Sequence, residues 1–413
     1  MTKQPLDRQD AGTAHWQRNL AVCVFGSFTT VFAMTVLLPF LPLYVAQMGI
    51  QGHAAIVQWS GIVFGATFLA AGLTAPLWGR LGDRYGRKPM LVRASIGMAI
   101  TMSLMGLTTN IWQLVTLRFL AGLSGGYSSG STILVATQTP KARSGWALGL
   151  LASGIMAGNL LGPLIGGVLP HLIGIRETFF GAGGFIFVAF LASMFLLQEP
   201  PRLVHAEAKR PKASWADILG SKVVMAMLAT GLLLMIANMS IEPIITVYVA
   251  TLVDDPKRVT LTAGLVMSAA ALGSIISASR LGKLADRIGH VTVITMALLV
   301  AGLLLLPQAF VTAGWQLIAL RFAMGLALGG LLPCIAAVIR HNVPDHSAGQ
   351  ALGYSLSAQF AGQVVGPMIG GFIGGQIGVR SVFFGTCVLM FIGVVINWFV
   401  RNQLRHSHPH PQL

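Results

Sequence analysis

The sequence predicts an all-α membrane protein built from two pseudo-symmetric six-helix bundles. Three observations support this prediction. Of the 413 residues, 54% are apolar and only 9% are charged, a proportion with which a soluble chain of this length could not cover its surface. Apolar segments long enough to cross a bilayer recur along the whole chain. Several sequence patterns also return about 204 residues after their first occurrence.

Twelve apolar segments each have about the 20 residues that cross the hydrocarbon core of a bilayer. We therefore expect twelve membrane-spanning helices. The segments lie at residues 19–47, 57–78, 91–108, 112–136, 146–170, 178–197, 223–250, 261–281, 291–310, 315–339, 350–373 and 380–400.

The net charge of +15 is distributed as in a membrane protein rather than in a nucleic-acid-binding protein. With the N-terminus placed inside, the inner loops with their adjoining segment ends and both tails hold 21 of the 27 lysine and arginine residues, whereas the outer side holds four. Basic residues collect on the cytoplasmic side of membrane proteins. We therefore expect both termini in the cytoplasm and no nucleic-acid partner.

A charged turn between two apolar segments occurs twice. The first runs from Gly79 to Leu91 and reads GRLGDRYGRKPML, and the second runs from Gly282 to Gly289 and reads GKLADRIG. Glycine lets the chain turn tightly because it has no Cβ atom, so each turn should make its flanking helices antiparallel neighbours. A charged turn that recurs after 203 residues indicates a duplicated chain.

Other patterns repeat at nearly the same offset. Trp112 opens WQLVTLRF and Trp315 opens WQLIALRF, while Tyr44 and Tyr248 each follow a proline by five residues. Two halves in the same orientation are a parallel membrane repeat. The sequence therefore predicts an N-terminal bundle at 1–197, a cytoplasmic linker at 198–222, a C-terminal bundle at 223–400 and a cytoplasmic tail at 401–413.

Two further features predict how the helices bend and pack. Proline removes a backbone hydrogen bond, so Pro39 and Pro243 should bend the first and seventh segments. A glycine-rich motif of the fifth segment returns in the eleventh, and its small residues let a neighbouring helix pack backbone to backbone. The motif serves either this packing or a more specific function. Its residues in the fifth segment are Gly158, Gly162, Pro163, Gly166 and Gly167.

Glu242 is the only acidic residue well inside an apolar segment. An ionisable group at such a position is costly and marks a functional site by default. At 1.5 Å per residue, Arg321 of the tenth segment lies about 9 Å below the outer end of its helix. Glu242 lies about 12 Å below the outer end of the seventh segment, so the two residues have a similar depth in the membrane. An ion pair is therefore feasible, and the arginine would keep the carboxylate ionised until the two separate. Such a pair could couple a proton to a conformational change, or it could only order the bundle.

Arg118 of the fourth segment corresponds to Arg321, but Leu38 stands where the first half would have a partner for it. Arg118 could bind an anionic group of a substrate, or backbone carbonyls could neutralise it. Further candidates for substrate contact are Tyr44, Tyr248 and Asn238.

Three motifs resemble those of the major facilitator superfamily. Gly79–Leu91 is similar to its cytoplasmic signature between helices two and three, and Arg118 with Gly122 is similar to its helix-four motif. Gly158–Gly167 is similar to the helix-five motif of its drug:proton antiporters. Shorter stretches, such as SGWALG at 144–149, resemble a bacterial multidrug-resistance branch of this family. The resemblance covers the whole chain.

The resemblance implies two bundles around a central cavity and alternating access driven by the proton gradient. It also implies a cytoplasmic gate in which Asp83 and Arg87 meet helix eleven, whose positive N-terminal end would attract an acid. Many such antiporters carry an acid in helix one. This chain has none there, so Glu242 and Asp83 are the candidates for the proton carrier. The residues expected at the gate are Asp83, Arg84, Arg87, Asp286 and Arg287.

We therefore expect a proton-coupled secondary transporter that exports drugs or other small amphipathic compounds through the bacterial inner membrane. Transport of one specific metabolite, or a sensor or scaffold without transport, are the alternatives. An enzyme is not expected, because the sequence has no nucleophile–base set or phosphate-binding loop. The three cysteines lie in separate apolar segments without paired spacing, so no disulfide or metal site is expected. The expected partners are a small-molecule substrate, protons and the bilayer, with no cofactor and a monomeric state.

Overall fold

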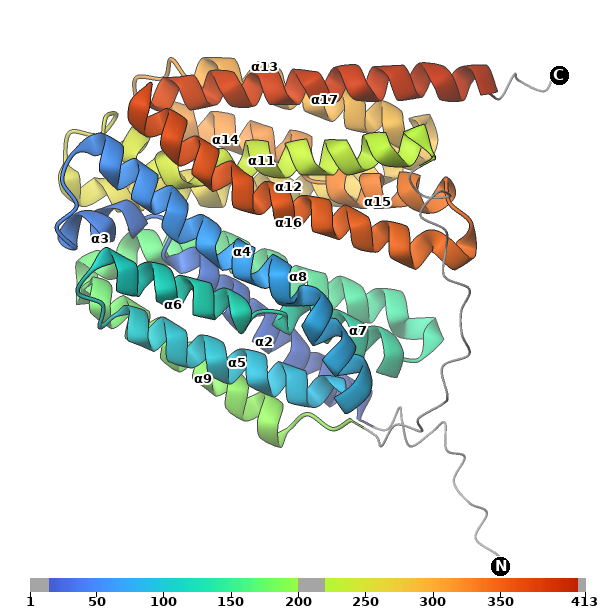
Figure 1. The fold of residues 1–413 in the computed structure, drawn as a ribbon, viewed down its shortest axis with the longest axis horizontal. Coiled ribbons are helices and arrows are strands. Elements are labelled where there is room, and N and C mark those ends of the chain that lie inside the picture. The colour runs from blue at the N-terminus through green and yellow to red at the C-terminus, as the bar shows by residue number, and fades with distance from the viewer. Residues whose placement is uncertain (1–14, 200–219, 408–413) are drawn as a thin grey trace, which may run out of the picture. The chain divides into compact units, whose positions relative to one another are not determined.

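A computed structural model of the protein describes residues 15–199 and 220–407, which form helices joined by short turns (Figure 1). Each of the twelve predicted apolar segments falls on helix. Within the described residues, nine spans are long and apolar enough to cross a membrane. The predicted all-α membrane fold is therefore confirmed. Most of the predicted linker and both chain ends lie outside the described residues.

The chain divides into two units. Unit 1 comprises residues 1–44 and 66–205, and unit 2 comprises residues 45–65 and 206–413. Residues 45–65 group with unit 2, although the sequence places them in the N-terminal bundle, so the border falls within helix α4 (His53–Tyr85). The finer boundaries expected at 197, 222 and 400 stay predictions.

The helices of the first half begin and end where glycine and capping side chains allow. Asn110 caps α6, because its side-chain oxygen accepts a hydrogen bond from Gln113 N at 3.0 Å, and such a cap satisfies an otherwise free N–H group. Gly86 separates α4 from α5 with φ of +100°, a conformation that glycine adopts readily. The helices of this half, besides α4, are α2 (Trp16–Val36), α3 (Leu41–Gln47), α5 (Arg87–Met105), α6 (Ile111–Leu123), α7 (Tyr127–Gln138), the short 3₁₀ helix η1 (Lys141–Arg143), α8 (Ser144–Ile173) and α9 (Ile175–Phe195).

The second half repeats this order. Gly289, with φ of +93°, separates α12 from α13 as Gly86 separates α4 from α5. The helices are α11 (Lys222–Val249), α12 (Pro256–Ile288), α13 (His290–Gln308), α14 (Gly314–Leu328), α15 (Leu331–His341), α16 (Asp345–Gln376) and α17 (Val379–Ser407).

The duplication extends to individual contacts inside each unit. The Tyr44 hydroxyl donates to the Met105 carbonyl at 2.7 Å, and the Tyr248 hydroxyl donates to the Gln308 carbonyl at 2.8 Å. Residues 105 and 308 occupy the same position in the two halves at the offset of 203. The repeat read from the sequence therefore corresponds to a repeated tertiary structure.

The glycine-rich motif packs helices backbone to backbone in both units. A Cβ atom on Gly158 of α8 would lie 2.9 Å from the Phe28 carbonyl oxygen of α2. A Cβ atom on Gly362 of α16 would lie 2.7 Å from the Leu232 carbonyl oxygen of α11. Neither site leaves room for a side chain, so the geometry supports the packing role of this motif.

Two predicted segments, 112–136 and 315–339, are not single helices. α6 ends before a turn at residues 124–126, and α14 ends before a turn at residues 329–330. Gly126 adopts φ of +102°, which ends the regular helix. Both turns contain adjacent glycines that lack a side chain to stabilise the helical backbone. Each of these two apolar segments is therefore made of two consecutive helices, a division that the apolar pattern alone does not reveal.

The prolines act differently in the two halves. Pro39 lies between α2 and α3, so the first segment consists of two helices rather than one bent helix. Pro243 lies inside the continuous helix α11. A second proline follows Pro39 at position 42, whereas Thr246 occupies the matching position in α11, which leaves the α11 backbone with one fewer missing N–H group.

Candidate functional site

Glu242 and Arg321 are positioned in unit 2 by α11 and α14. Their charges are close enough to influence each other, although no hydrogen bond or ion pair joins the two described side chains. Arg321 is only 5% exposed, whereas Glu242 is partly exposed. The predicted proximity is present without the predicted ion pair, so either side chain can take up another polar partner.

Asn238 lies one helical turn before Glu242 on α11. Its side chain is half-buried, and it makes no hydrogen bond to any residue that the structure describes. Its amide is therefore available to hydrogen-bond a ligand, as a residue that contacts a substrate must be.

Arg118 lies on α6 and is 1% exposed. The matching position to Glu242 in unit 1, Leu38, is buried as well. Enclosure of this kind means that a substrate reaches the guanidinium only if neighbouring helices move. Contact between Arg118 and an anionic substrate group stays a prediction.

Tyr44 and Tyr248 are buried, and their hydroxyl groups donate to the backbone carbonyls described above. Their rings also pack against Phe179 and Phe383, with ring centroids 5.2 Å apart in both units. These contacts give the two tyrosines a packing role, and the substrate contact expected from the sequence stays a prediction.

The charged turn of unit 1 is organised around Arg87, the first residue of α5. Its side chain forms an ion pair with Asp83, which is 64% exposed. A Cβ atom on Gly82 would lie 2.8 Å from the Arg87 Nη1 atom, so this glycine makes room for the guanidinium. Arg84, in contrast, points its guanidinium toward the ring of its exposed neighbour Tyr85.

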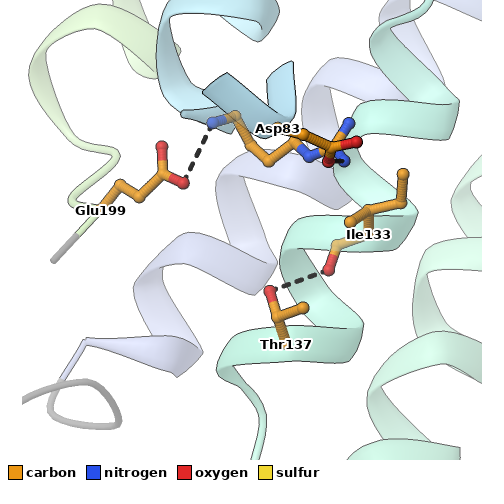
Figure 2. A network of polar contacts seen from close by, with 5 residues as sticks. Asp83, Ile133, Thr137 and Glu199 are labelled. Atoms are coloured by element: carbon orange, nitrogen blue, oxygen red, sulfur yellow. Dashed lines mark hydrogen bonds and ion pairs between the residues drawn. The ribbon is translucent and has the colours of Figure 1, made fainter. Parts of the chain in front are cut away.

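Glu199 is a member of this turn that sequence reasoning missed. Its carboxylate accepts hydrogen bonds from the backbone N–H groups of Arg87 at 3.0 Å and Lys88 at 2.7 Å. Figure 2 shows this carboxylate on one side of the turn and Asp83 on the other. An acid at a helix N-terminus is favoured by free N–H groups and by the helix dipole. Its only sequence signal was its place directly after the sixth apolar segment.

The charged turn of unit 2 uses a histidine where unit 1 uses an arginine. The Nε2 atom of His290 lies 3.6 Å from an Asp286 carboxylate oxygen, and this pair is ionic only when the imidazole is protonated. Arg287, which the sequence places at the gate, is exposed and forms no ion pair among the described residues, and its gating role stays a prediction. His290 could have been found from the offset of 203 residues that relates it to Arg87.

Comparisons with known proteins agree with this architecture. Two overlapping parts of the chain, residues 23–290 and 257–412, match the Major Facilitator Superfamily. The chain is 41% identical over 392 residues to the multidrug resistance protein MdtG of Salmonella typhimurium, which covers 95% of this chain and 96% of that protein. It is also 41% identical over 395 residues to MdtG of Citrobacter koseri, with the same two coverages.

Solved transporter structures share the fold. A bacterial homologue of the human lysosomal transporter Spinster superposes with a TM-score of 0.77 at 13% identity, covering 96% of this chain and 99% of that one. The nucleoside transporter NupG superposes with a TM-score of 0.74 at 12% identity, covering 92% and 99%. The match over nearly the whole chain and the identity to the MdtG proteins establish that this multi-pass membrane protein belongs to the Major Facilitator Superfamily.

Proposed function

We propose that this protein is a proton-coupled secondary transporter that exports drugs and other small amphipathic compounds by alternating access. The observation that carries the proposal is Glu242, an acid inside a membrane-spanning helix whose charge interacts with that of Arg321. The similarity to the multidrug resistance proteins MdtG, with 41% identity over 95% of this chain, supports drugs as the substrate class.

In this mechanism Glu242 carries the proton. The positive charge of Arg321 favours the ionised carboxylate, and protonation removes that attraction. If the two protonation states prefer different packings of α11 and α14, proton binding shifts the equilibrium between the two access states. Entry of a proton from outside and its release inside then drive the exit of the drug. Asn238, one turn away on the same helix, is suited to contact the drug.

The two charged turns are proposed to close the cytoplasmic side. Asp83 with Arg87, and Asp286 with His290, supply the ionic contacts, and Glu199 holds the first turn in place. The distribution of lysine and arginine supports cytoplasmic termini and a location in the inner membrane. We also propose that all twelve segments cross the bilayer and that the protein acts as a monomer.

The test uses purified protein in liposomes with an imposed pH gradient. A growth-inhibition panel, run with a deletion strain and an overexpressing strain, first selects a drug that the protein exports. Acceleration of drug transport by the gradient is expected in the wild type and should disappear in Glu242→Gln. Glu177→Gln, which removes an exposed acid of the same type at the start of α9, should retain it.

Two results would contradict the proposal at different points. Proton-driven transport that persists in Glu242→Gln would exclude Glu242 as the proton carrier. A panel in which neither strain differs from the parent strain in its sensitivity to any drug would exclude drug export as the function.

A further inference from the structure

Buried polar atoms without a hydrogen-bond partner occur on α11, α13 and α14 of unit 2, of which α11 carries Glu242 and α14 carries Arg321. They are the Thr246 hydroxyl oxygen, the Gln308 side-chain oxygen, and the Nε and Nη2 atoms of Arg321. Buried polar atoms of proteins are nearly always hydrogen-bonded to protein or to ordered water. The two Arg321 nitrogens can donate hydrogen bonds and the Gln308 oxygen can accept one, so the set contains both donors and acceptors.

The elements of unit 2 bring these atoms together. Thr246 lies one helical turn after Glu242 on α11. Gln308, at the end of α13, lies between α11 and α14, because its backbone carbonyl accepts from Tyr248 of α11 at 2.8 Å and its Nε2 atom lies 3.7 Å from the Met324 sulfur of α14. Met324 is one turn after Arg321 on α14.

The described residues of unit 1 repeat Arg321 as Arg118 but not the other members of this polar set. At the repeat offset, Leu38, Pro42 and Met105 stand where unit 2 has Glu242, Thr246 and Gln308. The packing contact is nevertheless the same in both halves, because Tyr44 bonds to the Met105 carbonyl as Tyr248 bonds to that of Gln308. The side-chain amide of Gln308 is therefore not needed for this contact, and its presence calls for another explanation.

Water is the partner that fits these atoms. A buried water makes two to four hydrogen bonds and needs a polar site, and one water can accept from Arg321 while it donates to Gln308 or Thr246. Glu242 lies one helical turn before Thr246 on α11, so water held by these atoms would lie near its carboxylate. Among the charged residues of the described helices, Arg321 interacts electrostatically with Glu242. Arg380, at the start of α17, interacts electrostatically with Tyr248.

We propose that Thr246, Gln308 and Arg321 hold ordered water that connects to the Glu242 carboxylate and delivers its proton. Thr246 and Gln308 are then positioning residues. A proton carried along this water binds a carboxylate oxygen of Glu242 and leaves a neutral carboxyl group, while Arg321 keeps its charge. The proposal rests on the proposed function, in which Glu242 carries the proton.

The test follows the protonation of Glu242 directly in the full-length protein in liposomes. Infrared difference spectra recorded across a pH titration report the C=O band of the protonated carboxyl group, which is assigned by its loss in Glu242→Gln. In Gln308→Met and in Thr246→Val the midpoint of this band should shift by about one pH unit toward alkaline pH, because a less polar pocket disfavours the ionised carboxylate.

Gln308→Met places in unit 2 the residue that unit 1 already carries at this position, so the Tyr248 contact should persist and the variant should fold. Thr246→Val is a second, nearly isosteric test. Thr295→Val is the matched control, because the Thr295 hydroxyl already donates to the Val291 carbonyl at 2.7 Å, and its titration should equal that of the wild type.

The outcomes separate this inference from the proposed function. If the Glu242 band titrates at the wild-type pH in both Gln308→Met and Thr246→Val, the water-holding role is overturned, whatever Glu242 does in transport. If both variants shift the band and Thr295→Val does not, the role is supported. Persistence of proton-driven transport in Glu242→Gln overturns the proposed function, and with it the proton delivery.

Discussion

Glu199 links two parts of unit 1 that are far apart in the sequence. It follows α9 and bonds to the first two backbone N–H groups of α5, 111 and 112 residues earlier in the chain. Glu199 falls in the predicted linker, because composition identifies a charged, proline-containing stretch. Composition does not reveal which helix end a single carboxylate in that stretch contacts. Glu242 and Arg321 were easier to identify as candidates, since a charge inside an apolar segment is conspicuous.

Glu199→Gln is expected to destabilise the protein without preventing its folding. The amide keeps one acceptor oxygen but loses the negative charge and the second acceptor at the start of α5. Loss of a helix cap costs about 0.5–2 kcal/mol, so the thermal unfolding midpoint in detergent should fall. Asp254→Asn, which changes an exposed acid in a turn of unit 2, should leave the midpoint unchanged. Equal midpoints for Glu199→Gln and the wild type would contradict the capping role.

At the scale of elements, the break between α6 and α7 is held by side chains of α4 and α5. Arg93 donates to the carbonyls of Leu123 at 3.1 Å and Gly125 at 2.8 Å, and Trp78 Nε1 donates to the Leu123 carbonyl at 2.8 Å. The Arg93 guanidinium also lies 3.5 Å from the centre of the Trp78 ring, a cation–π arrangement. These donors satisfy carbonyls that a helix end inside the membrane would otherwise leave free.

Arg93→Gln should lower stability through these carbonyls. A buried polar group left without a partner costs about 1–3 kcal/mol, so the thermal unfolding midpoint should fall clearly. Trp78→Phe should cost less alone, and the double variant should show a non-additive effect, because both side chains bond to the same carbonyl. Strictly additive losses would show that the two side chains do not act together on the break.

The twelve apolar segments were predictable because composition over about 20 residues decides whether a helix can lie in a bilayer. The breaks were not predictable from their glycines. Gly166 and Gly167 are adjacent inside the continuous helix α8, whereas Gly125 and Gly126 accompany a break. The difference lies in the neighbours, since donors from α4 and α5 meet the freed carbonyls at the break. Such contacts depend on tertiary packing, which a single segment does not encode.

Across the whole molecule, the two halves share their packing contacts but differ in their polar residues. Unit 2 holds Glu242 where unit 1 holds Leu38, and unit 1 holds Arg87 where unit 2 holds His290. The repeat was evident in the sequence because its tryptophan, glycine and tyrosine positions recur at fixed offsets. The ionic partners were only partly evident, because the gate residues expected from the sequence included Arg287 but not His290, which lies beside Asp286.

The two charged turns allow a test of the proposed gate that separates gating from stability. Asp83 is 64% exposed and Asp286 is 74% exposed, and exposed ion pairs contribute only about 0.2–1 kcal/mol to stability. Neither Asp83→Asn nor Asp286→Asn should therefore change the thermal unfolding midpoint by much.

Transport by the two variants should nevertheless differ. Arg87 is charged at every physiological pH, whereas His290 attracts Asp286 only when it is protonated. Asp83→Asn should then reduce proton-driven drug transport in liposomes at least about tenfold, a change of about 1.4 kcal/mol in the barrier, and Asp286→Asn should reduce it less. Wild-type transport by Asp83→Asn would exclude Asp83 from the gate. A transport loss matched by a lower unfolding midpoint would instead make the Asp83–Arg87 pair a structural contact.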